Sequence, residues 1–365
     1  MSTFRERRDL PSLDGARGPF INRTPGNRPF DLSSLRPVAL TAGAALLAAL
    51  TVGCELSSRP AAAAEPGTSF TVIALPDTQY YASSHPEILE AQIEWILRRR
   101  NAERIAFVVH EGDIVDTDEP RQWQTAARSL HRLDGAVPYV LTVGNHDYRR
   151  VGRYIGRETS VDDYFPAATL SAVAAASGTF EPEHIEDSFE ILDVRGGGPW
   201  LVLSLEFGPR DAVLAWADQV VDRYADLPAM VVTHAYLHSD GTRYDHLSPS
   251  NQLWNPHAYL PPDHPGDVND GEEIWRKLVE KHRNIAFVLC GHDLGAGVAR
   301  LTSVRPGGGV VQQLLANYQM GPLGGEGFLR VMRFFPEERK VAVQTYSPYT
   351  GRFKADPENE FQLGY

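Results

Sequence analysis

Cysteine is scarce in this 365-residue chain and positive charge is outnumbered, and each shortage excludes a class of protein. The two cysteines, Cys54 and Cys290, are too few for a disulfide framework or a site built from several thiolates. The formal net charge of −12 argues against a nucleic-acid scaffold. With 42% hydrophobic and 22% charged residues, the chain has the composition of a globular protein that buries a sizeable core.

Long hydrophobic runs are missing as well. The uncharged run from Val38 to Gly53 has 16 residues, whereas a membrane-spanning helix needs about 20. It follows an arginine-containing leader and precedes small residues, which is typical of an export signal. Residues 50–54, Leu-Thr-Val-Gly-Cys, are similar to a lipobox, in which the cysteine is acylated; cleavage within Ala61–Ala64 is the alternative. We therefore expect an exported protein, periplasmic or extracellular, with membrane attachment through acylated Cys54.

The rest of the chain reads as one domain of alternating strands and helices. We assign residues 1–65 to the export signal and linker, 66–355 to the domain and 356–365 to a C-terminal tail. Strands are expected at 69–75, 105–110, 138–143, 200–205, 230–233 and 285–290, and helices at 86–100, 119–133, 211–224 and 271–281. This βαβ order predicts a parallel sheet covered by helices, so the fold class is α/β. Short segments with glycine turns from 298 to 346 suggest an antiparallel part or a second sheet.

Polar side chains follow five of these strands at the point where each strand ends. In chain order they are Asp77 and Gln79, Asp113 and Asp116, Asn145 and His146, then His234, then His292 and Asp293. One such residue is more often a turn former, but five strands that each deliver one are hard to explain as turns. Because the carboxyl ends of neighbouring strands converge on one crevice, we expect a single site there. Carboxylate, amide and imidazole groups together favour divalent Mn, Zn or Fe.

Other enzyme classes lack their motifs. The chain has no G-x-S-x-G elbow, no phosphate-binding loop that ends in Gly-Lys-Ser and no dinucleotide fingerprint after its first strand. Serine-hydrolase, nucleoside triphosphatase and dehydrogenase functions are therefore disfavoured.

The blocks Gly-Asp-Ile-Val-Asp at 112–116 and Gly-Asn-His-Asp at 144–147 resemble those of the calcineurin-like metallophosphoesterases. An isolated His234 and a Gly-His pair at 291–292 follow in the right order. Residues 315–319, Leu-Ala-Asn-Tyr-Gln, are also similar to an exported bacterial branch of that family. The resemblance implies an αββα sandwich of two mixed β-sheets flanked by helices, with a two-metal site between strand ends.

Carried over by position, the resemblance implies a role for each ligand. Asp113 would bridge the two ions, because one carboxylate can span two metals. Asp77 would bind the first ion, and Asn145, His234 and His292 would bind the second. The implied cofactors are two divalent metal ions, with Mn, Zn and Fe suited to these ligands.

Two positions depart from the family pattern, and both concern the first ion. Gln79 stands where the family has His, and Leu294 replaces the second His of Gly-His-x-His. Gln79 can still offer an amide oxygen, whereas Leu294 cannot bind a metal unless Asp293 or a water takes its place. A first site made of oxygen ligands favours a labile Mn or Mg ion.

The same resemblance implies how substrate would be handled. His146 would lie beside the substrate phosphate and stabilise it or protonate the leaving oxygen, while Asp116 would orient the imidazole. Arg149 could hold phosphate oxygens, or lie in solvent as a surface charge. His238 belongs to the long segment 237–267, which we interpret as a lid because its histidines lack the spacing of a second metal site. Asn317 could line the pocket or simply end a strand.

We therefore expect an exported metal-dependent phosphoesterase that hydrolyses small or cell-surface phosphate mono- or diesters by attack of a hydroxide bridging the two metals. The alternative is a catalytically degenerate lipoprotein of the same fold that binds metal or a phosphorylated ligand, which Gln79 and Leu294 favour. The intact His146 argues against the alternative, because a binding protein has no need of a side chain that holds no metal.

Overall fold

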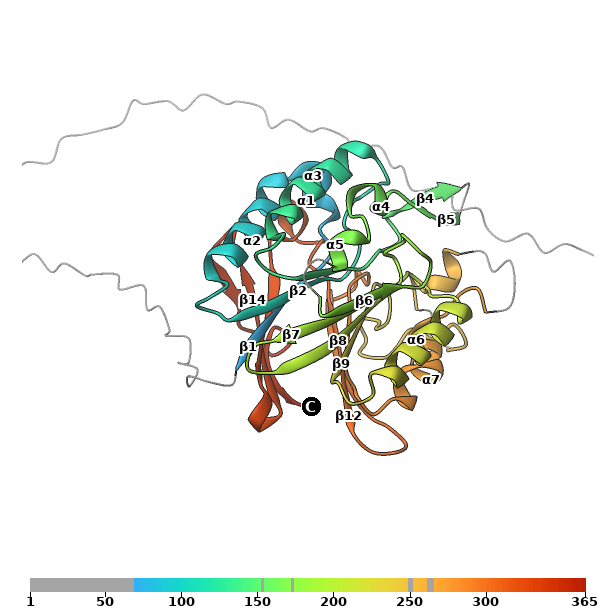
Figure 1. Cartoon of the computed structure of the whole chain (residues 1–365). Coiled ribbons are helices and arrows are strands. Elements are labelled where there is room, and N and C mark those ends of the chain that lie inside the picture. The colour runs from blue at the N-terminus through green and yellow to red at the C-terminus, as the bar shows by residue number, and fades with distance from the viewer. Residues whose placement is uncertain (1–68, 152–153, 172–173, 249–251, 261–265) are drawn as a thin grey trace, which may run out of the picture. The chain divides into compact units, whose positions relative to one another are not determined.

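The computed structural model describes residues 69–365, apart from 152–153, 172–173, 249–251 and 261–265 (Figure 1). The predicted export signal, linker and Cys54 lie outside the described residues. In the part of the chain that the structure describes, no helix is both long and apolar enough to cross a membrane.

One seven-stranded sheet is built on the first three strands of the domain. β1 (Phe70–Leu75), β2 (Ile105–His110) and β3 (Tyr139–Leu141) run parallel, and β13 (Leu329–Phe335) lies antiparallel beside β1. The sheet continues through β14 (Lys340–Ser347), with which β15 (Arg352–Lys354) and β16 (Glu360–Gly364) both pair. Parallel and antiparallel pairs therefore share one sheet.

The second seven-stranded sheet has the strand order β11-β12-β10-β9-β8-β7-β6. Its parallel centre consists of β8 (Gly198–Leu205), β9 (Ala229–Thr233), β10 (Ile285–Cys290) and β12 (Val310–Ala316). Antiparallel neighbours extend it: β11 (Val298–Val304) on one side, and β7 (Ser188–Val194) and β6 (Ala176–Thr179) on the other. A separate hairpin joins β4 (Tyr148–Val151) to β5 (Tyr154–Thr159).

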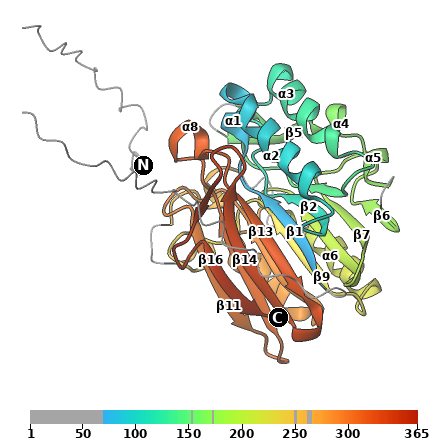
Figure 2. The ribbon, with the colours of Figure 1, turned by 90° about the vertical axis from the view of Figure 1, so that its left-hand side faces the viewer.

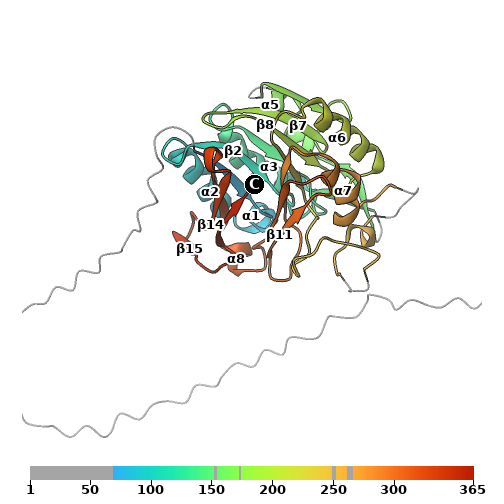
Figure 3. The ribbon, with the colours of Figure 1, turned by 90° about the horizontal axis from the view of Figure 1, so that it is seen from below.

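Helices cover the outer faces of both sheets. The first sheet carries α1 (Gln79–Ser84), α2 (Pro86–Arg99) and α3 (Pro120–Leu130), and the second carries α6 (Asp211–Arg223) and α7 (Gly271–Lys277). Figures 1 and 2 show α1–α3 grouped on one side, and Figure 3 shows α2 on the opposite side of the strands from α6 and α7. Shorter helices lie in the connections: α4 (Val161–Tyr164), α5 (Ala168–Ser171), α8 (Pro322–Gly325), and the 3-10 turns η1 (His131–Leu133), η2 (Pro256–Ala258), η3 (Val279–Lys281) and η4 (Pro336–Glu338).

Alternating side chains along each strand generate three apolar layers. In β1, Ile73 and Leu75 pack toward α1–α3, while Val72 and Ala74 face the second sheet. A third layer joins α6 and α7 to the second sheet. Helix, sheet, sheet and helix therefore stack in that order, and the predicted αββα sandwich is confirmed.

The strands and helices expected from the sequence are present with small shifts at their ends, but the last ten residues differ. Residues 356–365, expected to follow the domain as a tail, contain β16, which pairs with β14 over Lys340–Gln344. Phe361, Leu363 and Tyr365 pack against the layer between the sheets. The alternation of apolar and polar residues over 360–364 explains this pairing, because one face of the strand is partly buried and the other is exposed.

Candidate metal centre

The strand ends of the two sheets meet at one edge of the sandwich, and hydrogen bonds join them there. Between sheets, the His234 imidazole Nδ1 lies 2.7 Å from the main-chain oxygen of Glu111. The His292 main-chain N–H donates to the Asp77 carboxylate at 3.3 to 3.4 Å. The ends of β1, β2, β9 and β10 are thus brought to one place, as the sequence pattern predicts.

Asp113 lies at the middle of this group. Its Oδ1 accepts a hydrogen bond from the His146 main-chain N–H at 2.9 Å and lies 3.2 Å from His234 Nε2. The residue has φ 50°, a left-handed conformation that Asp adopts more readily than most residues. The preceding Gly112 has φ 96°, and a Cβ there would lie 2.5 Å from His234 Nδ1. Glycine is therefore required next to the bridging position, both for its conformation and for its size.

Asp77, Asp113 and His234 each offer a ligand atom, and these atoms all lie within 4.8 Å of one another. Burial raises the pKa of the Asp77 carboxyl to about 7, although the charge of His234 opposes this. Burial alone would lower the pKa of His234, but the carboxylates of Asp113 and Asp77 outweigh it and raise this pKa to about 9. Such a buried carboxylate pair demands a positive charge, which a proton or a metal cation can supply.

The hydrogen bonding tests whether these residues fit a metal. Gln79 Oε1 and Asn145 Oδ1 are buried and have no hydrogen-bond partner among the described residues, whereas the buried His234 Nε2 faces the Asp113 carboxylate at 3.2 Å. Buried polar atoms are normally paired, so two orphaned atoms in one site need an explanation. Both belong to expected ligands, and together with the His234 imidazole these oxygen donors suit divalent cations. The residues present therefore fit the implied metal ions.

The orientation of the His292 ring is fixed by a hydrogen bond to the segment 237–267. Its Nε2 lies 2.7 Å from the main-chain oxygen of Trp254 and donates to it, which leaves Nδ1 as the nitrogen with a free lone pair. Burial, with a smaller contribution from the charge of His234, lowers the pKa of His292 to about 4, so the ring is neutral. The two imidazole rings lie 5.0 Å apart between centroids.

His146 and Asp116 lie together at the rim of the centre. The His146 Nδ1 is 2.8 Å from the Asp116 main-chain oxygen and 3.6 Å from the Asp116 carboxylate. Burial opposes protonation, yet Asp113 and then the Asp116 carbonyl raise the pKa of His146 above its ordinary value. The carbonyl of Asp116 is thus the nearer partner that orients the ring, with the carboxylate further away.

The positions that depart from the family pattern offer oxygen ligands to the expected first ion. Gln79 begins α1, and its Nε2 donates to the Asp116 carboxylate at 3.3 Å while Oε1 remains unpaired. Asp293 does not replace the missing imidazole: Oδ2 accepts the Tyr244 hydroxyl at 2.6 Å, and Oδ1 accepts the Gly295 N–H at 3.0 Å. The chain thus offers Asp77, Asp113 and Gln79 to this ion.

The three expected substrate contacts lie in different surroundings. Arg149 is exposed and pairs with Glu158 at 3.0 Å and more loosely with Asp118 at 3.5 Å. His238 has both ring nitrogens near carboxylates, Asp240 at 3.2 Å and Asp293 at 3.6 Å. Asn317 follows β12, which lies beside β10, and its buried Nδ2 has no partner among the described residues. Of the three side chains, Asn317 is the one whose buried donor, the amide Nδ2, has no partner among the described residues.

Three further residues interact with the centre. Tyr80 follows Gln79 in α1, and burial together with the charges of Asp116 and Asp113 raises its pKa. Tyr259 in the lid lies 5.6 Å from the His292 ring, and Arg150 opposes protonation of His146 through its charge. The position of Tyr80 next to a ligand was a usable sequence signal, whereas Tyr259 is brought in by an irregular loop and Arg150 lies in strand β4.

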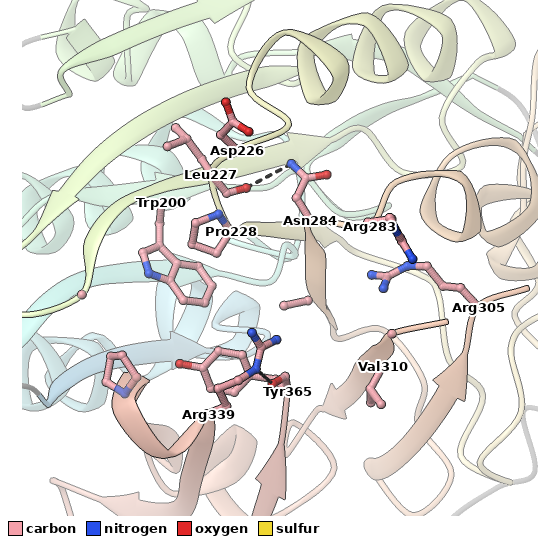
Figure 4. A pocket seen from close by; sticks show the side chains of 14 residues that line it. Trp200, Asp226, Leu227, Pro228, Arg283, Asn284, Arg305, Val310, Arg339 and Tyr365 are labelled. Carbon is pink, nitrogen blue, oxygen red and sulfur yellow. Dashed lines mark hydrogen bonds between the residues drawn. The ribbon is translucent and has the colours of Figure 1, made fainter. Parts of the chain in front are cut away.

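A cavity of about 370 Å³ lies away from this centre (Figure 4). Its lining includes residues at the beginnings of four strands of the second sheet: Trp200, Pro228, Asn284 and Val310. The candidate ligands follow the opposite ends of the strands. Arg283, Arg305 and Arg339 also line the cavity, which is thus a separate basic hollow and not part of the metal centre.

Comparison with known proteins places these residues in a family. The calcineurin-like phosphoesterase family matches residues 70–295, more than half of the chain, from strand β1 past His292. The Bacillus subtilis (strain 168) "Uncharacterized protein YvnB" is 32% identical over 288 residues, which are 77% of this chain and 20% of that protein. The chain thus spans about a fifth of that relative's length.

Two solved structures illustrate the similarity at low sequence identity. Purple acid phosphatase PPD1 from yellow lupin (Lupinus luteus) is 14% identical with a TM-score of 0.45, covering 82% of this chain and 54% of that one. The NAD nucleotidase NadN of Haemophilus influenzae is 10% identical with a TM-score of 0.40, covering 82% and 51%. From the extent of the family match, the chain belongs to the calcineurin-like phosphoesterase family.

Proposed function

We propose that this protein is an exported, metal-dependent phosphoesterase that hydrolyses phosphate mono- or diesters outside the cytoplasm. Membership of the calcineurin-like phosphoesterase family supports phosphoester hydrolysis. The observation that carries the proposal is the buried group of Asp77, Asp113 and His234, together with the unpaired ligand oxygens of Gln79 and Asn145. Export and attachment through Cys54 rest on the sequence of residues 38–54, outside the described residues.

Asp77, Asp113, Asn145, His234 and His292, with Gln79, would hold the metal ions. When bound, a divalent metal pair supplies positive charge to the phosphoryl oxygens and activates a water for in-line attack on phosphorus. The chain itself orients the ligands: Glu111 and Trp254 bond the imidazoles through their main-chain oxygens. These contacts fix which ring nitrogen faces the ions.

His146 is the chain's own proton donor in this proposal. The Asp116 carbonyl engages Nδ1, so Nε2 is the nitrogen left for substrate. Asp113 in particular raises the pKa of His146 against the effect of burial, which favours the protonated ring. A protonated imidazole at the rim can bond a phosphoryl oxygen and deliver its proton to the leaving oxygen.

The activity test is hydrolysis of chromogenic phosphate monoesters and diesters by the full-length chain. We expect turnover with Mn²⁺, loss of turnover after exhaustive chelation and recovery when Mn²⁺ is restored. The relative rates on the two ester classes identify the substrate class. Asp113→Asn should stay inactive under all conditions, and activity that survives chelation in the wild type would overturn the proposal.

A non-hydrolytic binding protein is the second candidate, because Gln79 and Leu294 weaken the first ion's ligand set. Asp293 is engaged by Tyr244 and Gly295, so it does not repair that set. This candidate predicts that inorganic phosphate binds the Mn²⁺-loaded chain in equilibrium dialysis without turnover of either ester class. Measurable turnover that Asp113→Asn abolishes would exclude it.

A further inference from the structure

A second cluster of metal-ligating side chains lies between the lid segment and α7, apart from the centre described above. It consists of His246, His257, Asp270 and Glu273, whose ligand atoms all lie within 4.8 Å of one another. The histidines alone have no metal-site spacing in the sequence. The fold completes the set because Asp270 and Glu273, at the start of α7, meet both imidazoles.

The geometry of the four ligand atoms suits one small cation. His246 Nδ1 lies 2.8 Å from Asp270 Oδ2 and 3.8 Å from Glu273 Oε2. His257 Nε2 lies 2.8 Å from Glu273 Oε2 and 4.0 Å from Asp270 Oδ2. These distances bracket the ~3.3 Å that separates ligands around a tetrahedral Zn²⁺ ion with bonds of ~2.0 Å.

Charge points the same way. Asp270 is fully buried and Glu273 is half-buried, so two carboxylates share a site of limited solvation. The imidazole rings of His246 and His257 face each other with centroids 3.9 Å apart. Lys277 Nζ lies 3.8 Å from Glu273 Oε1, whereas Asp270 Oδ2 is met by the His246 main-chain N–H at 2.7 Å and by the Asn255 amide at 3.2 Å. A divalent cation among the four atoms neutralises both carboxylates and needs neutral imidazoles as ligands.

The carboxylates are already held in place by the helix start. Asp270 Oδ1 accepts the Glu273 main-chain N–H, and Glu273 Oε2 accepts the Asp270 main-chain N–H, a reciprocal capping box. This arrangement orders both carboxylates without a metal. The His246 and His257 side chains retain 30% and 25% exposure, so an ion can enter from solvent.

We propose that His246, His257, Asp270 and Glu273 form a tetrahedral Zn²⁺ site that fastens the lid segment to α7. Asn255 donates to Asp270 Oδ2 at 3.2 Å. It directly follows Trp254, whose main-chain oxygen accepts a hydrogen bond from the His292 ring. The ion thus braces the loop that orients a ligand of the candidate metal centre. The site is independent of the proposed phosphoesterase activity, since none of its four ligands belongs to that centre.

Metal content and visible spectroscopy test the site on the full-length chain. After chelation, we expect Co²⁺ to produce the intense visible bands of tetrahedral coordination in the wild type and in Asp113→Asn. The double variant His246→Gln/His257→Gln should lose these bands and bind one Zn²⁺ ion fewer per chain. His85→Gln, a change at a solvent-accessible histidine outside both sites, should keep the bands and the zinc.

Unchanged bands and zinc content in the folded double variant would overturn the proposal. A measurement on the wild type alone covers the case in which that variant does not fold. Anomalous diffraction at the zinc edge from Zn²⁺-soaked crystals should show a peak between the four side chains, and absence of that peak at full soaking would also overturn it. Loss of ester hydrolysis has no bearing on either result, so the two proposals fail separately.

Discussion

At the scale of single residues, the candidate centre combines a buried cluster of hydrogen-bonded carboxylates and imidazoles with two buried oxygens, on Gln79 and Asn145, that have no partner among the described residues. The residue types could be read from the sequence, because each stands directly after a strand in a recognisable block. Their hydrogen bonds could not, since they come from main-chain oxygens of Glu111, Asp116 and Trp254. Any residue offers a main-chain oxygen, so no side-chain pattern in the sequence marks these partners.

His146 and Asp116 provide the first prediction. His146→Ala should lower kcat by about 10²- to 10⁴-fold, because the proton donor is lost, while the metal content per chain stays unchanged. Asp116→Asn should lower kcat by only about tenfold, because the 2.8 Å bond to Nδ1 comes from the main chain and survives. Steady-state kinetics with parallel metal analysis measure both, and full activity in His146→Ala would refute the assigned role.

Glu190 provides a prediction on pH and stability. This residue of β7 is fully buried, and neither carboxyl oxygen has a hydrogen-bond partner among the described residues. Burial raises its pKa from 4.5 to about 8. Since the folded pKa exceeds the unfolded one, the contribution to stability is present below pH 4.5 and is lost as the pH rises through 8.

Glu190→Gln should therefore raise the free energy of unfolding at pH 9 by ~2–4 kcal/mol relative to the wild type, and by much less at pH 5. Denaturant unfolding at the two pH values measures the difference. Glu90→Gln, on the exposed face of α2, is the matched control and should change neither value appreciably. An equal effect of Glu190→Gln at both pH values would mean that ionisation of Glu190 does not lower the free energy of unfolding.

At the scale of elements, the turn after β3 holds Asp113 in place. A Cβ on Gly144 would lie 2.2 Å from Asp113 Oδ1 and 2.4 Å from the Asp113 main-chain nitrogen. Gly144→Ala should displace the bridging carboxylate, weaken Mn²⁺ binding by at least about tenfold and lower the melting temperature. Gly307→Ala is the control, because a Cβ there meets no described atom within 4 Å. Unchanged Mn²⁺ affinity in Gly144→Ala would contradict the placement of Asp113.

The elements themselves were predictable where the hydrophobic pattern is long and ends in turn residues. β2 and β10 match their expected ranges, because each is a continuous apolar run before a polar block. β7 was missed: it lies between irregular segments, and its buried Glu190 breaks the apolar pattern. A long connection between β9 and α7 was expected, but the contact of its Trp254 main-chain oxygen with His292 depends on tertiary packing.

At the scale of the whole molecule, the sandwich followed from the family resemblance more than from local pattern. The sequence alone indicates strands and helices but not which strands share a sheet, because pairing between β1 and β13 joins residues more than 250 positions apart in the chain. β16 illustrates this limit of sequence-based prediction. Its five alternating residues do not reveal a partner strand in the sequence, and the fold places them beside β14.

The central claim is that this fold holds a two-metal centre despite Gln79 and Leu294. Its most direct test is the number of Mn²⁺ ions bound per chain in equilibrium dialysis at saturating free Mn²⁺. The full-length His246→Gln/His257→Gln variant serves for this count, so that the proposed zinc site does not contribute. The account predicts two ions per chain, and fewer in the same variant with Asp113→Asn; one ion or none before that change would contradict it.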